Sequence, residues 1–235
     1  MSSSAKAKLK LDWCTHAAAR YAVEHWHYSR TMPVSKSLKV GVWEDGLFVG
    51  AVVYAQGGNY RIGDPYGLTQ LQAAELVRVA LREHSAPVSR ILSIAGRFVR
   101  SHCPGLRLIV SYADSVEGHH GGIYQAAGWV YVGRTSPTSE LRLDGLRLQK
   151  RAYTGSNFNF AGGGRSGKSD VPDGAVRVMV PGKHKYLMPL DDEMRARVAP
   201  LAKPYPKRAG TSTRDGAPVE VGGATPTPAL QCPAP

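Results

Sequence analysis

The fold of this chain is decided between Leu108 and Gly133, where the sequence reads LIVSYADSVEGHHGGIYQAAGWVYVG. Apolar and β-branched residues predict a strand over 106–112 and a second strand over 129–133. Between the two strands, a polar loop leads into a short predicted helix over 122–127, and the glycine that follows is a common helix terminator. A strand, a short helix and a strand in direct succession indicate an α/β domain.

The sequence on both sides extends this α/β pattern. One helix is predicted over Cys14–Trp26 with Asp12 as its cap, and Pro87 is predicted to open another helix that runs to about residue 102. Residues 71–82 are compatible with either a helix or a strand. Further strands are predicted over 38–43, 47–55 and 140–148. Together these elements predict a mixed, partly antiparallel central sheet flanked by helices.

The composition changes near residue 153, and this change sets the expected domain organisation. We expect a catalytic domain over 1–153, a Gly/Ser-rich linker over 154–174, a basic hook segment associated with the domain over 175–198, and a disordered tail over 199–235. The linker contains a match to the phosphate-loop pattern GxxxxGK(S/T). Proline and glycine follow the match at once and cannot continue the helix that this loop requires, so we interpret it as a chance match.

Charge and cysteine content limit the class of protein. The formal net charge of +12 favours a polyanionic partner, and nucleic acid is the most common one inside cells. Three widely spaced cysteines, Cys14, Cys103 and Cys232, form neither a disulfide framework nor a zinc motif. No signal peptide or membrane-spanning run is apparent, so we expect a cytoplasmic protein without a membrane partner.

The segment Gly122–Trp129 resembles the end of the GNAT acyltransferase core. In that fold a tyrosine at the position of Tyr124 often serves as the general acid for the leaving group, because a phenol is a positioned, weakly acidic donor. Asp114 follows the preceding strand, at the edge where α/β sheets hold their ligands, and could orient or deprotonate an amino group. Ser111 on the same strand is a candidate hydrogen-bond donor. A core tyrosine and a turn-capping aspartate are the alternative interpretations.

Four sequence blocks together resemble the Mom family of phage DNA-modification proteins. The blocks are HWHYSR at 25–30, SYAD at 111–114, GIYQAAGW at 122–129 and GKHKYLMP at 182–189. The resemblance implies a GNAT-like enzyme that converts the exocyclic amino group (N6) of adenine in double-stranded DNA to a carbamoylmethyl derivative. Such a modification protects phage DNA from host restriction. The resemblance does not specify an oligomeric state.

The group donor stays open because the coenzyme A motif of GNAT enzymes is not matched. Where their glycine-rich turn is expected, the chain reads REHSAPVSR at 82–90. Ser85 and Ser89 could hold a phosphate at the helix start, and Arg78 or Arg90 could pair with it. The donor could be acetyl-CoA or an aminoacyl compound. Iron is permitted but not required, and no metal ligands are assigned.

Five residues are candidates for the substrate side. A base that is modified must leave the helix stack, which requires aromatic and basic groups beside the cleft. We expect His27, Tyr28 and Arg30 to form a loop on the substrate side. In this loop Arg30 contacts phosphate, and Tyr28 or Trp26 stacks on an extruded base. Lys183 and Lys185 are expected to contact the DNA backbone. Two alternatives remain: an acetyl-CoA-dependent N-acetyltransferase acting on a small amine or a protein, and a non-enzymatic DNA-binding protein with a GNAT-like fold.

Overall fold

The computed structural model describes residues 8–56, 60–148 and 171–207. The predicted linker from 154 to 170, with its phosphate-loop match, and the tail from 208 onward lie outside the described residues. The elements, in chain order, are β1 (Leu9–Trp13), α1 (His16–Trp26), β2 (Ser37–Glu44), β3 (Leu47–Ala55), η1 (Asp64–Tyr66), β4 (Ala73–Leu81), α2 (Val88–His102), β5 (Leu108–Ala113), η2 (Ser115–Glu117), α3 (Gly122–Ala126), β6 (Val130–Arg134), β7 (Thr138–Leu143), β8 (Leu146–Arg147), β9 (Val176–Val180), β10 (His184–Pro189), α5 (Asp192–Val198) and η3 (Ala199–Leu201).

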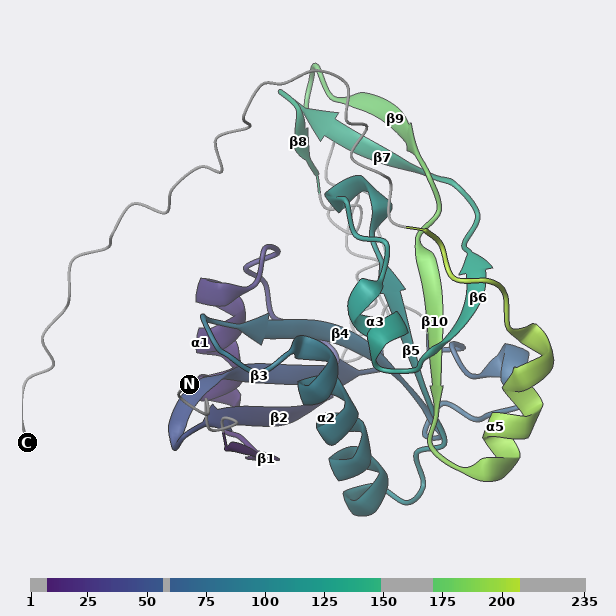
Figure 1. Cartoon of the computed structure of the whole chain (residues 1–235). Helices are drawn as coiled ribbons and strands as arrows, with labels where there is room; N and C mark the ends of the chain where they lie inside the picture. Colours follow the sequence, from purple (N-terminus) through teal and green to yellow (C-terminus); the bar gives the residue numbers. More distant parts are fainter. Residues whose placement is uncertain (1–7, 57–59, 149–170, 208–235) are drawn as a thin grey trace, which may run out of the picture.

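A seven-stranded sheet forms the body of the protein. Its strand order is β1-β2-β3-β4-β5-β10-β6, and every pair is antiparallel except β4 with β5. Figure 1 shows β1–β4 in one half of the sheet and the upright strands β5, β10 and β6 in the other. A separate three-stranded sheet, β8-β7-β9, stands beyond the end of the second half. The predicted mixed, partly antiparallel α/β fold is therefore confirmed.

Helices cover both faces of the first half of the sheet. On one face, α1 buries Ala19, Ala22 and Val23 against small side chains of β3 and β4. On the other face, α2 contributes Ile91 and Leu92, among others, to the main core. Both helices bury an apolar stripe at 3.6-residue spacing, which is the main source of helix stability in a globular protein.

Several local predictions need correction. Asp12 does not cap α1, because it lies in β1; the Thr15 hydroxyl caps the helix by accepting from the Ala18 amide at 3.1 Å. The ambiguous segment 71–82 contains strand β4. The single strand expected over 140–148 is a hairpin, in which β7 and β8 are joined by a turn whose residue Asp144 has a φ of 49°.

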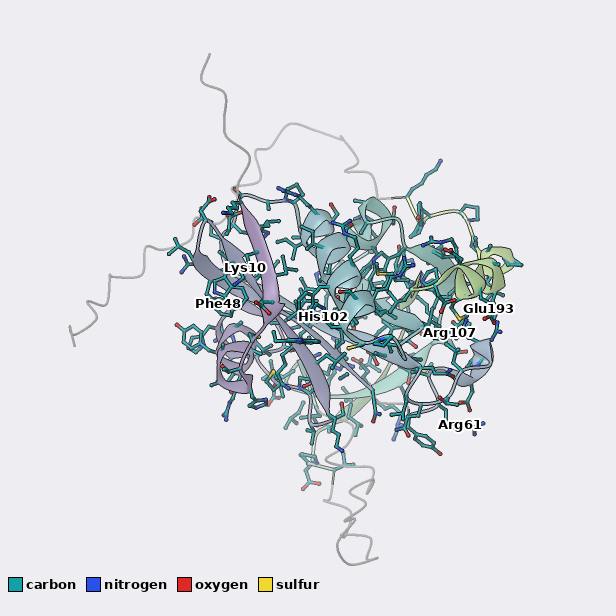
Figure 2. All side chains as sticks on the ribbon, turned by 90° about the horizontal axis from the view of Figure 1, so that it is seen from below. Lys10, Phe48, Arg61, His102, Arg107 and Glu193 are labelled. Carbon is teal, nitrogen blue, oxygen red and sulfur yellow. The ribbon has the colours of Figure 1, made fainter. Side chains whose placement is uncertain are left out.

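The segment expected to form a basic hook associated with the domain supplies an internal strand of the sheet. β10 lies between β5 and β6 and pairs with both, so residues 184–189 complete the sheet rather than attach to it. Arg107 fixes the helix that follows β10 by donating two hydrogen bonds to Asp191, at 2.7 and 2.9 Å, and one to Glu193 at 2.8 Å. Figure 2 shows Arg107 and Glu193 side by side at this edge.

The first residues of the predicted tail, 199–207, are part of the described structure. Residues 199–207 include η3 and run along β6: the Lys203 amide donates to the Tyr131 carbonyl at 2.8 Å, and the Tyr205 hydroxyl donates to the Trp129 carbonyl at 2.7 Å. These contacts hold the segment against the sheet. Within the described ranges, every helix is too short or too polar to cross a bilayer.

Candidate active site

A cleft of about 760 Å³ opens where β4 and β5 separate. The two strands pair only from Ala73 with Leu108 to Glu75 with Val110. Beyond that point β4 carries a register shift, because its partner positions on β3 skip residue 77. A bulge of this kind bends a strand and ends its pairing. The cleft is lined by Trp26, His27, Tyr28, Leu76, Val77, Arg78, Val79, Leu81, His84, Val88, Tyr112, Ala113, Gly118, His119, His120, Gly121, Gly122, Ile123 and Tyr124.

The charge of this cleft is distinctive. Its lining contains one arginine and four histidines, and within the described part of the chain no aspartate or glutamate belongs to it. Three tyrosines and a tryptophan supply aromatic surface. A cleft with cationic and hydrogen-bonding groups but no carboxylate suits a ligand that is planar and carries phosphate.

Tyr124 and Ser111 meet in the cleft floor. The Ser111 hydroxyl is fully buried, 3.1 Å from the Leu76 carbonyl and 2.9 Å from the Tyr124 hydroxyl. A carbonyl only accepts, so Ser111 uses its single proton to donate to the Leu76 carbonyl. The Tyr124 hydroxyl then donates its own proton to the Ser111 oxygen. Burial raises the pKa of Tyr124 to about 12. The phenol therefore holds its proton at neutral pH, as a general acid must.

His27 and Tyr28 form one wall of the cleft, just after α1. His27 is buried, while Tyr28 is exposed and lies over its ring at a centroid distance of 4.3 Å. Burial lowers the pKa of His27 to about 4, with smaller contributions in the same direction from the charges of Arg78 and His119. His27 is therefore neutral at physiological pH. An exposed tyrosine beside a buried, neutral histidine can stack on a planar ligand and donate a hydrogen bond to it.

Arg78 braces this wall from β4. Its Nε donates to the Thr31 carbonyl at 3.0 Å, and one Nη1 proton goes to the Val77 carbonyl at 2.7 Å. Burial lowers the pKa of Arg78, but a guanidinium keeps its charge throughout the accessible pH range. A half-buried, orientated cation in the cleft attracts a phosphate or a developing negative charge. Arg78 was expected to bind a phosphate of the group donor. It lines the same cleft as His27 and Tyr28, which were expected on the substrate side.

Asp114 lies outside the set of described residues that line the cleft. Its carboxylate accepts from Lys183 Nζ at 2.6 Å and from the Val116 amide at 3.1 Å, and Arg147 is 3.8 Å away. Burial raises the pKa of Asp114, but Lys183, the amide and Arg147 outweigh it, so the net shift is downward. This geometry joins β5, β8 and the segment before β10. Asp114 was expected to act as a base toward the substrate, but its carboxylate does not line the cleft.

The two lysines of the predicted hook are engaged inside the fold. Lys183 pairs with Asp114, as described above. Lys185 is half-buried with its Nζ 5.0 Å from the centre of the Tyr66 ring, and burial lowers its pKa. Arg30 is exposed just beyond His27, with a φ of 45° and its amide donating to the His27 carbonyl at 3.0 Å. Of these three cations, Arg30 is the one whose side chain is exposed beside the cleft wall.

The expected phosphate-binding turn before α2 is already occupied by a carboxylate. Glu44 accepts from the Ser85 amide and the Ala86 amide, each at 2.8 Å, and from the Ser85 hydroxyl at 3.0 Å. Ser85 therefore does not present free donors to a phosphate, and Glu44 would repel one. Ser89 lies in the first turn of α2 and accepts at its carbonyl from the Ser93 hydroxyl at 2.8 Å, and Arg90 follows it.

Three histidines that line the cleft, His84, His119 and His120, were not predicted as site residues from the sequence. A single histidine in the irregular segment before a helix carries no periodic or motif signal. The pair His119-His120 is framed by Gly118 and Gly121, both with positive φ, and this glycine frame was the available signal for a loop at the site. Tyr186 fixes the loop by donating to the His120 carbonyl at 2.6 Å.

No metal centre is formed by side chains in the described ranges. There, no three histidine, cysteine, aspartate or glutamate side chains converge as ligands. Iron therefore remains a hypothesis without a ligand set among these residues.

A model of the Mom protein family matches residues 8–207. The chain belongs to the Mom protein family. This family match covers the whole described body and confirms the resemblance based on the four sequence blocks. Membership of this family supports a role in phage DNA modification.

Comparison with solved structures finds FeeM, an N-acyl amino acid synthase from uncultured soil microbes. The two chains are 10% identical, with a TM-score of 0.44, over 84% of this chain and 99% of that one. The comparison with curated proteins found no match.

Proposed function

We propose that this Mom-family chain transfers a carbamoylmethyl-type group to the exocyclic amino group of adenine in double-stranded DNA. The observation that carries the proposal is the carboxylate-free cleft, in which a protonated, buried Tyr124 faces a wall made by His27, Tyr28 and Arg78. The product would protect the DNA from restriction enzymes.

The cleft contains the groups that binding an extruded base requires. Tyr28 is the exposed aromatic surface on which a base would stack, and its position over His27 limits the orientations of the ring. Arg30, exposed at the end of this wall, would contact the backbone phosphate of the extruded nucleotide. A flipped base is held by stacking and by hydrogen bonds to its edge, and the neutral His27 ring supplies such a hydrogen bond.

Tyr124 would act as the general acid. Its hydroxyl is held by Ser111, and its raised pKa keeps the proton in place until the leaving group develops negative charge. Arg78 would stabilise that charge without proton transfer, because a guanidinium stays protonated. Ser111 is thus a positioning residue for Tyr124, and Asp114 is assigned a structural role.

The contacts of Glu44 favour a donor that is not held through a pyrophosphate at the turn before α2. Its carboxylate occupies the amides of Ser85 and Ala86, the donors that such a group would need. The same contacts disfavour the alternative of an acetyl-CoA-dependent N-acetyltransferase. A donor that carries its leaving group on the methylene carbon, such as an activated carbamoylmethyl compound, would need no clamp at this turn.

Nucleoside mass spectrometry of DNA from an expressing bacterial host tests the proposal. Wild-type protein should add the mass of one carbamoylmethyl group to deoxyadenosine and make plasmid DNA resist some restriction enzymes. The variant Tyr124→Phe should lower the modified fraction by about 10²–10⁴-fold while DNA binding persists. Ser111→Ala is the matched control, because it removes the same hydrogen bond and leaves the phenol; its loss should be smaller. Unmodified deoxyadenosine despite well-folded wild-type protein would refute the proposal.

A further inference from the structure

Main-chain groups fix the tautomer of His27. Its Nδ1 accepts a hydrogen bond from the Ser29 amide at 3.1 Å, and the Ser29 hydroxyl lies 2.8 Å from the same nitrogen. An amide N–H can only donate, so Nδ1 carries no proton. The buried ring is neutral, as its pKa near 4 requires, and its one proton must therefore be on Nε2. His27 thus enters the cleft as a hydrogen-bond donor.

A second histidine in the same cleft has the opposite tautomer. Nδ1 of His84 lies 2.7 Å from the carbonyl oxygen of Arg82. A carbonyl can only accept, so Nδ1 must carry the proton. In the neutral ring, Nε2 then holds the lone pair, on the side of the imidazole away from its own backbone. His84 is half-buried between β4 and α2 and lines the cleft.

The proposed reaction needs such an acceptor. The lone pair of an exocyclic amine on an aromatic base is delocalised into the ring, so the nitrogen becomes an effective nucleophile only as it loses a proton. Other groups of the cleft cannot take that proton: Tyr124 and Arg78 are protonated, and His27 presents Nε2–H. His119 and His120 also line the cleft, but the contacts of the described residues fix neither of these rings as an acceptor.

We propose that His84 is the general base of this site and that His27 is its complementary hydrogen-bond donor. The inference rests on the proposed function. As the amino nitrogen bonds to the methylene carbon of an activated carbamoylmethyl donor, its proton passes to His84 Nε2. The bond from that carbon to the leaving group breaks, and the leaving group departs with the electron pair and takes the Tyr124 proton. Solvent then returns one proton from His84 to Tyr124.

The surroundings of His84 support this role. Glu44 on β2, held by the amides just after His84, interacts electrostatically with the imidazole and would stabilise the imidazolium as it forms. The exposed Arg82 and Glu83 precede His84 in the chain. The other titratable groups among the described lining residues of the cleft are His27, Tyr28, Arg78, Tyr112, His119, His120 and Tyr124. Glu44 thus has two functions, as it closes the turn before α2 and faces the base.

The test uses the full chain in buffered bacterial extract, which supplies the donor, with plasmid DNA as substrate and modified deoxyadenosine as the readout. His84→Gln should lower modification by about 10²–10⁴-fold at unchanged melting temperature. The matched control is His102→Gln, since His102 also has Nδ1 bonded to a carbonyl, that of Phe98 at 2.8 Å, but lies outside the set of described cleft residues. Its activity should equal that of the wild type.

Two further readouts separate a base from a structural residue. Wild-type activity should depend on pH because only the neutral imidazole accepts a proton, and the His84→Gln protein should lack this dependence. Imidazole added to the His84→Ala protein should restore part of the activity. If the wild type modifies DNA and the His84→Gln protein is equally active, the assignment of His84 as the base is overturned, and the proposed function is not. Absence of modification by the wild type would instead overturn the proposed function, and the base assignment with it.

Discussion

Replacing Asp114 by asparagine separates a structural from a catalytic aspartate. The change preserves the shape and the oxygen that accepts from the Val116 amide, and removes the charge that pairs with Lys183 and Arg147. If Asp114 ties β5 to β8 and to the segment before β10, the variant should lose stability. If it instead deprotonates the substrate, the variant should lose activity at unchanged stability.

The magnitude follows from burial. The Asp114 side chain is 6% exposed and its partner Lys183 is 37% exposed, so water screens their 2.6 Å contact only partly. A hydrogen bond between charged groups of this kind contributes about 1.5–3 kcal/mol. A loss of about 2 kcal/mol lowers the melting temperature of a domain of this size by about 4–8 °C.

Differential scanning calorimetry across pH provides the assay. The pair holds the pKa of Asp114 below that of the unfolded chain. Its stabilisation is therefore complete above the unfolded value, about 3.9, and is lost as the pH falls through the folded value. The deficit of Asp114→Asn should be full at neutral pH and shrink in acid. Asp12→Asn is the control, because its pair with Lys10 is exposed and spans 3.5 Å. A normal melting curve with abolished modification would refute the structural assignment.

Two other predictions concern the fold around the site. Ending the chain after Lys207 should leave the melting temperature within about 2 °C of the full-length value. Ending it after Val198 should lower the melting temperature by more, because η3 and the contacts of residues 199–207 with β6 are lost. Thermal melts of both proteins test this. Gly121→Ala should cost about 1–3 kcal/mol in urea denaturation, because the glycine has a φ of 83° and its new methyl would meet the buried ring of Tyr186. Gly118→Ala, at a φ of 71° in open space, carries the backbone strain without the clash, and an equal loss for both variants would contradict the steric part.

Local patterns in the sequence predicted most elements of the body. The strand over 47–55 and the helix after Pro87 were found at nearly their observed bounds, because alternation and helical spacing are properties of contiguous residues. Strand order is a different kind of information. Nothing local in residues 184–189 indicates that they pair between β5 and β6, since that position depends on which neighbours leave an edge open.

In the candidate site, too, the sequence predicted features that depend on neighbouring residues but not those that depend on tertiary packing. The sequence identified Tyr124 and Ser111, which share one hydrogen bond, because each belongs to a motif block. It could not identify the partners that decide roles. Lys183 neutralises Asp114 from a distant segment, and Glu44 occupies the amides expected to hold a phosphate. Such pairings arise from tertiary packing, so residue types alone assign a chemistry but not its accessibility.

The placement of β10 has a consequence for synthesis on the ribosome. β5 and β6, which flank β10, end at Ala113 and Arg134, but β10 itself begins only at His184. A nascent chain that has emerged as far as β6 therefore exposes two unpaired strand edges, which are templates for association with other chains. The half of the sheet formed by β5, β10 and β6 can close only after residue 189 has left the exit tunnel. Enzymatic competence would then arise late in translation, and a pause before residue 184 should prolong the interval in which a chaperone is needed.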